Sequence, residues 1–160
     1  MDGRALIVNA DDFGQGQGVN RGVIRAFEEG ILTSASAMVR WPAASEAAAY
    51  ARAHPSLGVG LHVDLGEWAY RRGEWVPLYE VVPMKPDPVR LEVERQVARF
   101  RELFGTNPTH LDSHQHVHRD EPVRSELWNL AAELGVPLRM FNPRIRYCGD
   151  FYGVDPRGNP

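Results

Sequence analysis

A short segment of the sequence, residues 109–118, concentrates groups that could bind a metal ion or transfer protons. It contains one aspartate and four of the chain's six histidines: His110, His114, His116 and His118. These histidines occupy alternate positions, so on an extended chain their side chains are expected to point to the same face. Neutral imidazole is a common metal ligand and an acid or base near neutral pH. We therefore expect this segment to belong to a metal-assisted active site.

The pattern of apolar residues predicts strands that alternate with helices. Strands are predicted at 4–10, 33–39, 57–65, 109–112 and 136–141, and helices at 19–30, 42–53, 89–104 and 121–134. The strands are short runs of branched or small apolar residues, as in buried parallel sheets, whereas the helices repeat apolar residues about every four positions. Residues 66–88 break this rhythm and are predicted to form a long aromatic loop. No element is predicted from residue 142 onward.

Alternating strands and helices imply parallel strands joined by right-handed crossovers. Two architectures fit this order, an open doubly wound sheet and part of a (β/α) barrel. Asp11 and Asp12 follow the first predicted strand, His62 lies near the end of the third, and His114 follows the fourth. A barrel collects catalytic groups at the carboxyl ends of its strands, which would bring all of these residues to one rim. We therefore predict an α/β fold, an incomplete parallel (β/α) barrel of about five strand–helix units, as one domain over residues 1–160.

One carboxylate and two imidazoles make a metal site that leaves positions open for water and substrate. Asp12, His62 and His114 could supply these ligands. A bound divalent ion would lower the pKa of its water to roughly 7 and polarise an amide or ester carbonyl. Asp11 would remain beside the metal as a free carboxylate, which is a natural general base. The plainer alternatives are a turn or helix cap for the two aspartates and a satisfied core position for His62.

Other residues are expected to surround this site. Asp112 could orient a ligating histidine or cap a turn. His116 and His118 are candidates to lie beside the substrate or behind the metal ligands, whereas His110 is expected to be structural. The aromatic residues of segment 66–88 could form a lid over the core or a surface on which sugar rings stack, since aromatic faces serve both uses.

Composition limits the class of protein. Hydrophobic residues make up 43% of the chain and charged residues 24%, which suits one globular domain. The net charge is -3 and no basic run stands out, so no nucleic-acid partner is expected. Cys148 is the only cysteine, which excludes an internal disulfide. The apolar run at the N-terminus is too short for a signal peptide or a membrane span, so a cytoplasmic protein without a membrane partner is expected.

Four segments together resemble the YdjC-like carbohydrate deacetylases, which include the ChbG-type chitooligosaccharide deacetylases: NADDFG at 9–14, TSASAMV at 33–39, GLHVDL at 60–65 and THLDSHQHVH at 109–118. The resemblance implies a distorted (β/α) barrel of the polysaccharide-deacetylase type. It also implies a hydrolase of carbohydrate metabolism and polysaccharide catabolism that removes N-acetyl groups from sugars or chitooligosaccharides. It assigns metal binding to Asp12, His62 and His114, and the catalytic base to Asp11. The family is usually assigned magnesium, whereas two imidazole ligands favour zinc or another transition metal.

Members of that family continue well past residue 160, with a late histidine-containing motif thought to supply the general acid. The sequence is therefore expected to be an N-terminal portion whose exposed sheet edge is covered in a homo-oligomer. Other functions stay open. One is a metal-dependent phosphoesterase or amidohydrolase, for which the pair His114 and His116 would be typical. Another is a chain that binds a metal or a sugar without turnover. A non-haem iron oxygenase shares the ligand set but leaves Asp11 without a role.

Overall fold

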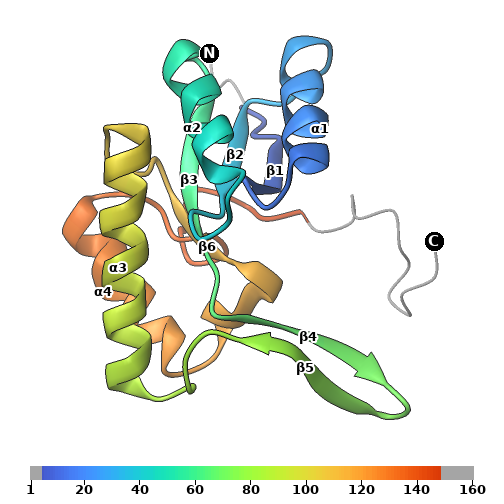
Figure 1. Ribbon diagram of the computed structural model, residues 1–160. Helices are drawn as coiled ribbons and strands as arrows, with labels where there is room; N and C mark the ends of the chain where they lie inside the picture. The colour runs from blue at the N-terminus through green and yellow to red at the C-terminus, as the bar shows by residue number, and fades with distance from the viewer. Residues whose placement is uncertain (1–4, 149–160) are drawn as a thin grey trace.

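The computed structural model describes residues 5–148 and contains a parallel sheet with helices packed along it (Figure 1). The sheet has four strands in the order β1 (Asn9–Phe13), β2 (Ser34–Ala37), β3 (Gly58–Val63) and β6 (Leu111–Ser113). The helices are α1 (Gln17–Glu28), α2 (Ala44–Ala53), α3 (Pro86–Phe104) and α4 (Val123–Leu134). Two further strands, β4 (Gly66–Arg71) and β5 (Glu74–Glu80), form a separate antiparallel pair, and a 3-10 helix, η1 (His114–Arg119), follows β6 directly. Residue 4 of the first predicted strand and residues 149–160 of the tail lie outside the described residues.

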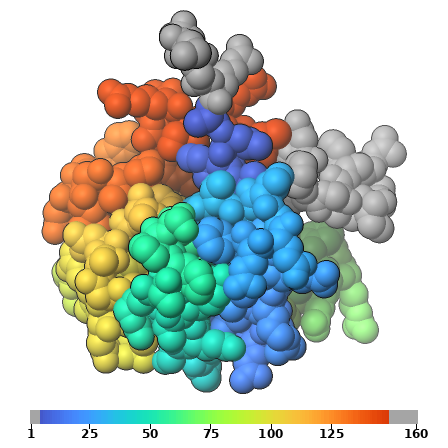
Figure 2. All heavy atoms as spheres, turned by 90° about the horizontal axis from the view of Figure 1, so that it is seen from above, coloured from blue at the N-terminus to red at the C-terminus, as the bar shows by residue number. Residues whose placement is uncertain are grey.

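The order of the strands distinguishes between the two predicted architectures. The parallel strands follow chain order across the sheet, so every crossover proceeds in the same direction. Crossovers of one hand then place their helices on one face, as in the wall of a (β/α) barrel, whereas a doubly wound sheet reverses direction and carries helices on both faces. Figure 2 shows the surfaces of α1, α2, α3 and α4 following one another around one end of the molecule, from blue to orange. The structure thus confirms the predicted α/β class with a parallel sheet.

The two faces of the sheet carry different side chains because neighbours along a strand point in opposite directions. The buried apolar residues of one set pack with the helices into the hydrophobic core: Ala35, Ala37, Val59, Leu61, Val63 and Leu111. The residues between them are small or polar: Ser34, Ser36, Gly58, Gly60, His62 and Asp112. One face of the sheet is therefore the core, and the other presents polar groups.

Local sequence signals mark three of the helix ends. Pro86 begins α3, where its missing N–H costs no hydrogen bond. Gly105 ends α3 with φ +74 and Gly135 ends α4 with φ +66, both in the left-handed region that glycine adopts readily. The predicted helices at 89–104 and 121–134 end directly before these glycines. Within residues 5–148, none of the helices combines the length and the apolar character needed to cross a bilayer.

Segment 66–88 contains a β-hairpin, so the predicted irregular loop is wrong. β4 and β5 pair up to Arg71 and Glu74, and the turn between them consists of Arg72 and Gly73. These two residues have φ +54 and +91, the positive values that a two-residue hairpin turn favours. The hairpin extends away from the sheet and the helices (Figure 1).

Two predicted strands also differ from those observed. Segment 136–141 contains no strand, and only Leu138 forms an isolated parallel bridge with Leu111. Pro137 precedes the bridging residue and has no N–H with which to extend a ladder. The first strand is displaced toward the C-terminus, because pairing with β2 begins at Asn9 and Ile7 is exposed.

Gly60 allows the His110 ring to lie directly against β3. A Cβ atom at Gly60 would be 2.4 Å from Nε2 of His110, which is far inside normal contact. The Ser36 hydroxyl lies 2.9 Å from the same ring nitrogen and holds the ring in place. The polar face of the sheet is therefore closely packed at this level.

We expect Gly60→Ala to lower the free energy of unfolding by about 1–3 kcal/mol, because the added methyl overpacks the space that the His110 ring occupies. Urea denaturation would measure the change. Gly22→Ala is the matched control, since a Cβ at Gly22 in α1 meets nothing within 4 Å. That change should raise stability by up to about 1 kcal/mol through helix propensity. Equal effects of the two substitutions would contradict the packing described.

Candidate functional site

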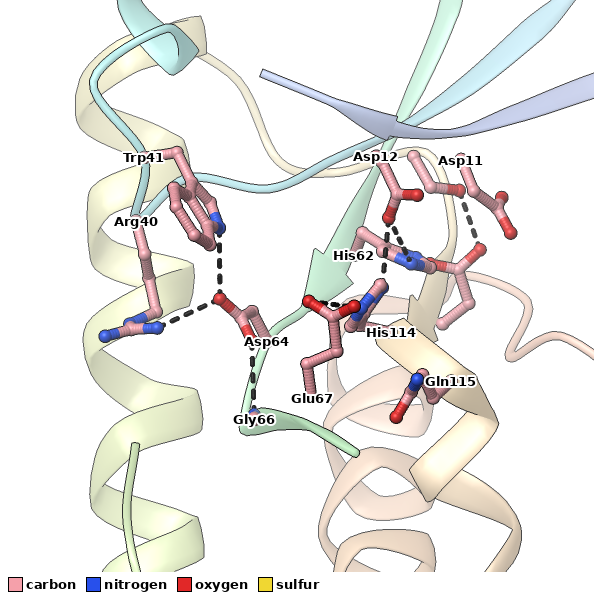
Figure 3. A network of polar contacts seen from close by, with 12 residues as sticks. Asp11, Asp12, Arg40, Trp41, His62, Asp64, Gly66, Glu67, His114 and Gln115 are labelled. Atoms are coloured by element: carbon pink, nitrogen blue, oxygen red, sulfur yellow. Dashed lines mark hydrogen bonds and ion pairs between the residues drawn. The ribbon is translucent and has the colours of Figure 1, made fainter. Parts of the chain in front are cut away.

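Asp12, His62 and His114 meet at the carboxyl ends of three parallel strands (Figure 3). Asp12 lies in β1, His62 lies in β3, and His114 is the first residue after β6. The Asp12 Oδ1 atom is 3.4 Å from Nε2 of His62 and 3.0 Å from Nδ1 of His114. One possible ligand atom of each residue lies within 4.8 Å of the others. The fold therefore brings together the three residues that were predicted as metal ligands.

A bend in β1 lets two adjacent aspartates contribute to the same region. Neighbours on a regular strand point to opposite faces. Asp12 has φ +64, and the pairing register between β1 and β2 shifts between Ala10 and Phe13. Such a bulge re-aims the side chains of the strand that contains it. The change of direction at the aspartate pair is thus an irregularity inside the strand.

Asp112 fixes the orientation of His62. The Asp112 Oδ1 atom is 2.6 Å from Nδ1 of His62, and both side chains are buried. This contact leaves Nε2 of His62 directed at Asp12, the arrangement in which carboxylates commonly support a ligating histidine. Burial alone disfavours the imidazolium, but the charge and hydrogen bond of Asp112 raise the pKa of His62. A histidine that binds a metal ion is neutral. A cation bound at Nε2 of His62 would therefore replace the proton that makes the imidazolium.

The donor set of Asp12, His62 and His114 suits a divalent cation. Burial opposes ionisation of Asp12, but the hydrogen bonds with His114 and His62 hold the pKa of its carboxyl well below the usual range. An ionised carboxylate with two imidazoles is a set typical of zinc and other transition ions. The three residues therefore fit a metal ion, which they would hold between three strand ends.

Arg139 is a residue of the site that the sequence analysis missed. Its Nη1 and Nη2 atoms donate to the two carboxylate oxygens of Asp11 at 2.7 and 2.6 Å. The Nη2 atom is also 2.5 Å from Oδ2 of Asp112. Both oxygens of Asp11 therefore bind a guanidinium, which was not expected, whereas the place of Asp11 beside a metal without binding it stays a prediction. Arg139 is one of many scattered arginines, and no sequence pattern distinguishes it from the others.

A second group of possible ligands contains Asp11, His62 and Asp112, whose donor atoms also lie within 4.8 Å of one another. The guanidinium of Arg139 already contacts both carboxylates of this group. A positive charge at that position opposes a second cation. The structure thus favours one metal position over two.

The histidine segment does not stay extended, so the predicted common face of its four histidines is wrong. β6 ends at Ser113, and the chain then enters η1, where Gln115 and His116 have φ +50 and +56. His118 turns back into the interior, and its Nδ1 lies 2.7 Å from the Ser113 hydroxyl. Burial lowers the pKa of His118 to about 4.

His116 and His118 do not join the group of possible metal ligands in the described part of the chain. The His116 ring is half-buried and contacts the rings of His118 and Tyr147 at centroid distances of 5.9 and 6.1 Å. Burial lowers the pKa of His116 as well. Their predicted place beside the substrate or behind the ligands remains a prediction, and both residues lie in η1, two and four positions after His114.

The hairpin contacts the region of the site in two places. The Glu67 carboxylate, at the start of β4, reaches to 3.9 Å from Nε2 of His114. The Gln115 side-chain amide bonds the backbone of Trp68 in both directions, each time at 2.9 Å. Neither contact was predicted, because segment 66–88 was expected to be an irregular loop. Recognition of the Arg72–Gly73 turn would have placed the hairpin, although not these contacts.

Asp64 ties the base of the hairpin to the end of β3. Its carboxylate is fully buried, two residues after His62 in the sequence. It accepts hydrogen bonds from Arg40 Nη1 at 2.9 Å, from Trp41 Nε1 at 3.2 Å and from the Gly66 N–H at 3.2 Å (Figure 3). A fourth hydrogen bond comes from the Tyr79 hydroxyl at 2.9 Å. Burial and the adjacent Asp64 carboxylate raise the pKa of Tyr79. This cluster therefore fixes the hairpin, and with it Glu67, relative to the strand that carries His62.

Comparison with known proteins gives a family match over nearly the whole chain. Residues 5–153 match the family described as YdjC-like protein. A chitooligosaccharide deacetylase from Serratia marcescens is 38% identical over 86% of this chain. A carbohydrate deacetylase from Geobacillus stearothermophilus is 40% identical over 85% of this chain. In each case the chain spans 59% of the relative's length.

A solved structure shares the fold. It is the crystal structure of a protein from Enterococcus faecalis proposed to cleave cellobiose phosphate, and it is 28% identical to this chain with a TM-score of 0.68. The match covers 82% of this chain and 57% of that protein. A common fold at this identity agrees with the parallel sheet and the order of elements described above.

Proposed function

This chain belongs to the YdjC-like protein family, and we propose that it acts as a metal-dependent deacetylase of N-acetylated sugars or chitooligosaccharides. The names of its relatives in Serratia marcescens and Geobacillus stearothermophilus support this substrate class. One observation carries the proposal. Asp12, His62 and His114 meet within 4.8 Å at the ends of three strands, and the Asp11 carboxylate lies within the same distance of His62.

The proposed cofactor is one divalent metal ion held by Asp12, His62 and His114. When bound, such an ion supplies a nucleophile from water near neutral pH and draws electron density from an amide carbonyl. Asp112 would keep the ligating nitrogen of His62 directed at the ion. The resemblance to the family favours magnesium, whereas two imidazole ligands favour zinc or another transition metal.

Asp11 is the proposed base that accepts a proton from the attacking water. Arg139 binds both of its carboxylate oxygens, and the Asn9 amide donates to Oδ1 at 2.8 Å. These contacts hold the carboxylate near His62 and so near the proposed metal position. A base acts only within hydrogen-bond reach of the proton that it accepts. These contacts therefore support a role for Asp11 as a base that accepts a proton beside the proposed metal position.

We expect Asp11→Asn to reduce acetate release by about 10²–10⁴-fold, because an amide cannot accept the proton that the carboxylate accepts. Metal affinity should change little, since the ligands Asp12, His62 and His114 are kept. Acetate assays and titration of the metal-free protein with Zn²⁺ or Mg²⁺ would measure the two effects separately. Asp87→Asn is the control, because the Asp87 side chain is 88% exposed in α3. Full activity of Asp11→Asn would refute the role of Asp11 as base.

The alternative functions make different predictions. A two-metal phosphoesterase or amidohydrolase would bind two ions, and Arg139 between Asp11 and Asp112 opposes the second. A chain that only binds a metal or sugar would respond to titration with acetylated sugars but would release no acetate. Product detection alongside binding therefore separates the deacetylase from both alternatives.

The predicted substrate rests on the sequence and on the names of the relatives, whereas the predicted setting and self-association rest on the sequence alone. The substrate partner would be an acetylated sugar or oligosaccharide, and carbohydrate catabolism in the cytoplasm would be the setting. Self-association into a homo-oligomer stays a prediction, which light scattering at high protein concentration would test. A mass equal to one chain would count against it.

A further inference from the structure

Three neighbouring strands present polar side chains on the face of the sheet opposite the hydrophobic core. His62 in β3 is in register with Asp112 in β6. Ser36 in β2 is in register with Gly60 in β3. Gly60 has no side chain, which leaves room for Ser36 and Asp112 to meet across β3. The Ser36 hydroxyl lies 2.6 Å from Oδ2 of Asp112, and both side chains are fully buried. The carboxylate that orients His62 therefore has a partner of its own on β2.

The His110 ring adds a further group to these polar side chains. His110 directly precedes β6, and its ring occupies the space that a side chain at Gly60 would fill. Its Nε2 atom lies 2.9 Å from the Ser36 hydroxyl, and its Nδ1 atom lies 2.9 Å from the hydroxyl of Thr109, which is exposed. The hydrogen bonds thus form one polar chain that begins at the surface and consists of Thr109, His110, Ser36, Asp112 and His62.

The Ser36 hydroxyl fixes the direction of these hydrogen bonds. A hydroxyl has one hydrogen to donate and two lone pairs that accept. The Asp112 carboxylate, paired with Arg139 at 2.5 Å, can only accept, so it takes the hydrogen. The Asn9 amide donates to the hydroxyl oxygen at 2.9 Å, and the Arg139 guanidinium is a more distant donor at 3.4 Å. His110 must therefore donate to Ser36 through a proton on Nε2.

A neutral His110 ring satisfies both of its contacts. Burial lowers the pKa of His110, so the ring is neutral near pH 7 and carries one N–H. A proton on Nε2 donates to Ser36, and the bare Nδ1 atom accepts from the Thr109 hydroxyl. The other tautomer would set a lone pair of Nε2 against a lone pair of Ser36. The hydrogens of the polar chain therefore point from the surface toward Asp112.

We propose that His110 and Ser36 are positioning residues for the metal site, because through Asp112 they hold the His62 ring with its Nε2 atom directed at the cation. The inference rests on the proposed function, which supplies the metal ion. Groups that support a ligating histidine contribute about 10–100-fold in metal affinity. Two residues that are not among the proposed ligands thus strengthen the binding of the metal.

Titration of the metal-free protein with Zn²⁺ tests this assignment. We expect Ser36→Ala to weaken Zn²⁺ binding about tenfold, because Asp112 loses a hydrogen bond that holds it. His110→Leu should weaken binding at least about threefold, since it acts through Ser36. His110→Gln should retain most of the affinity, because the glutamine amide can donate to Ser36 in place of Nε2. Ser34→Ala is the matched control, since Ser34 is buried two positions before Ser36 on the same face of β2.

Nitrogen NMR of the histidine side chains at pH 7 provides a measurement that packing alone does not determine. We expect the His110 ring of the wild-type protein to carry a proton on Nε2, where it donates to Ser36. A His110 ring without a proton on Nε2 would overturn the assignment, because Ser36 would then receive no hydrogen bond from it.

Wild-type affinity for Zn²⁺ in either Ser36→Ala or His110→Leu would also overturn the assignment, as would equal losses in His110→Leu and His110→Gln. Acetate release is measured in the same samples but decides a separate question. Zn²⁺ affinity that depends on Ser36 and His110, without acetate release, would support the polar chain and refute the deacetylase. Acetate release with Zn²⁺ affinity unchanged in these variants would support the deacetylase and refute the role of the polar chain.

Discussion

Acetate release is expected to fall about a thousandfold when His114 is replaced by alanine. The change removes one of three proposed metal ligands, and a metal ion contributes several kcal/mol of transition-state stabilisation, with about 1.4 kcal/mol for each factor of ten. Metal affinity should fall together with activity, because only Asp12 and His62 would remain as ligands. Acetate assays and metal titration of the same variant would measure both losses.

The matched control for this prediction is His54→Ala. His54 caps the C-terminal end of α2, where it stacks on Tyr50 at a centroid distance of 4.0 Å. It precedes β3, whereas the proposed site lies at the opposite end of that strand. Full activity of His114→Ala with metal still bound would exclude His114 as a ligand. A similar loss in His54→Ala would mean that the assay reports folding rather than the site.

Replacing Asp64 with alanine should lower the free energy of unfolding by about 3–5 kcal/mol, the effect of breaking a buried ion pair from one side. The substitution leaves Trp41 and Tyr79 without an acceptor and removes one of the two buried carboxylates that pair with Arg40, the other being Glu92. It also releases the base of the hairpin from β3. Chemical denaturation would give the loss of stability, and hydrogen exchange in β4 and β5 would show whether the hairpin loosens first.

Asp87→Ala provides the comparison for Asp64. The Asp87 side chain is 88% exposed in the first turn of α3, so its removal should cost less than about 1 kcal/mol. If Asp64→Ala cost no more than Asp87→Ala, the four hydrogen bonds to Asp64 would contribute little to stability. In that case the hairpin would be held mainly by Gln115 and by packing.

The helices and the central strands could be predicted because their apolar spacing reflects burial against the same core. Val93, Val97, Phe100 and Phe104 recur along one face of α3, and all four are buried. The first strand was misplaced because apolar residues indicate burial only where a neighbouring strand exists. β1 lies at the edge of the sheet, and Leu6 and Ile7 are exposed there.

The hairpin was not predicted because segment 66–88 contains residues that favour strands together with residues that oppose them. Pro77 argues against a central strand, yet it is tolerated here because β5 has only β4 as a neighbour. The aromatic pair Tyr70 and Trp75 faces across the strands next to the Arg72–Gly73 turn. An arginine at positive φ is uncommon, so the sequence favoured an irregular loop over this turn.

The candidate ligands could be predicted because parallel strands end at a common rim. The order of strands and helices along the chain was enough to place Asp12, His62 and His114 together. Arg139 and Gln115 could not be found in this way. Arg139 reaches Asp11 across 128 positions in the sequence, and Gln115 bonds a hairpin that was not predicted. Contacts of this kind depend on the packed structure rather than on a motif.

The most direct test of the metal site is an anomalous-difference map from crystals of the protein loaded with Zn²⁺, which scatters anomalously at accessible X-ray energies. We expect one peak, at about 2.0–2.2 Å from an oxygen of Asp12 and from one ring nitrogen each of His62 and His114. The energy of the absorption edge would identify the element. A map without a peak among these three residues, or with an ion between Asp11 and Asp112 in place of the Arg139 guanidinium, would contradict the proposed centre.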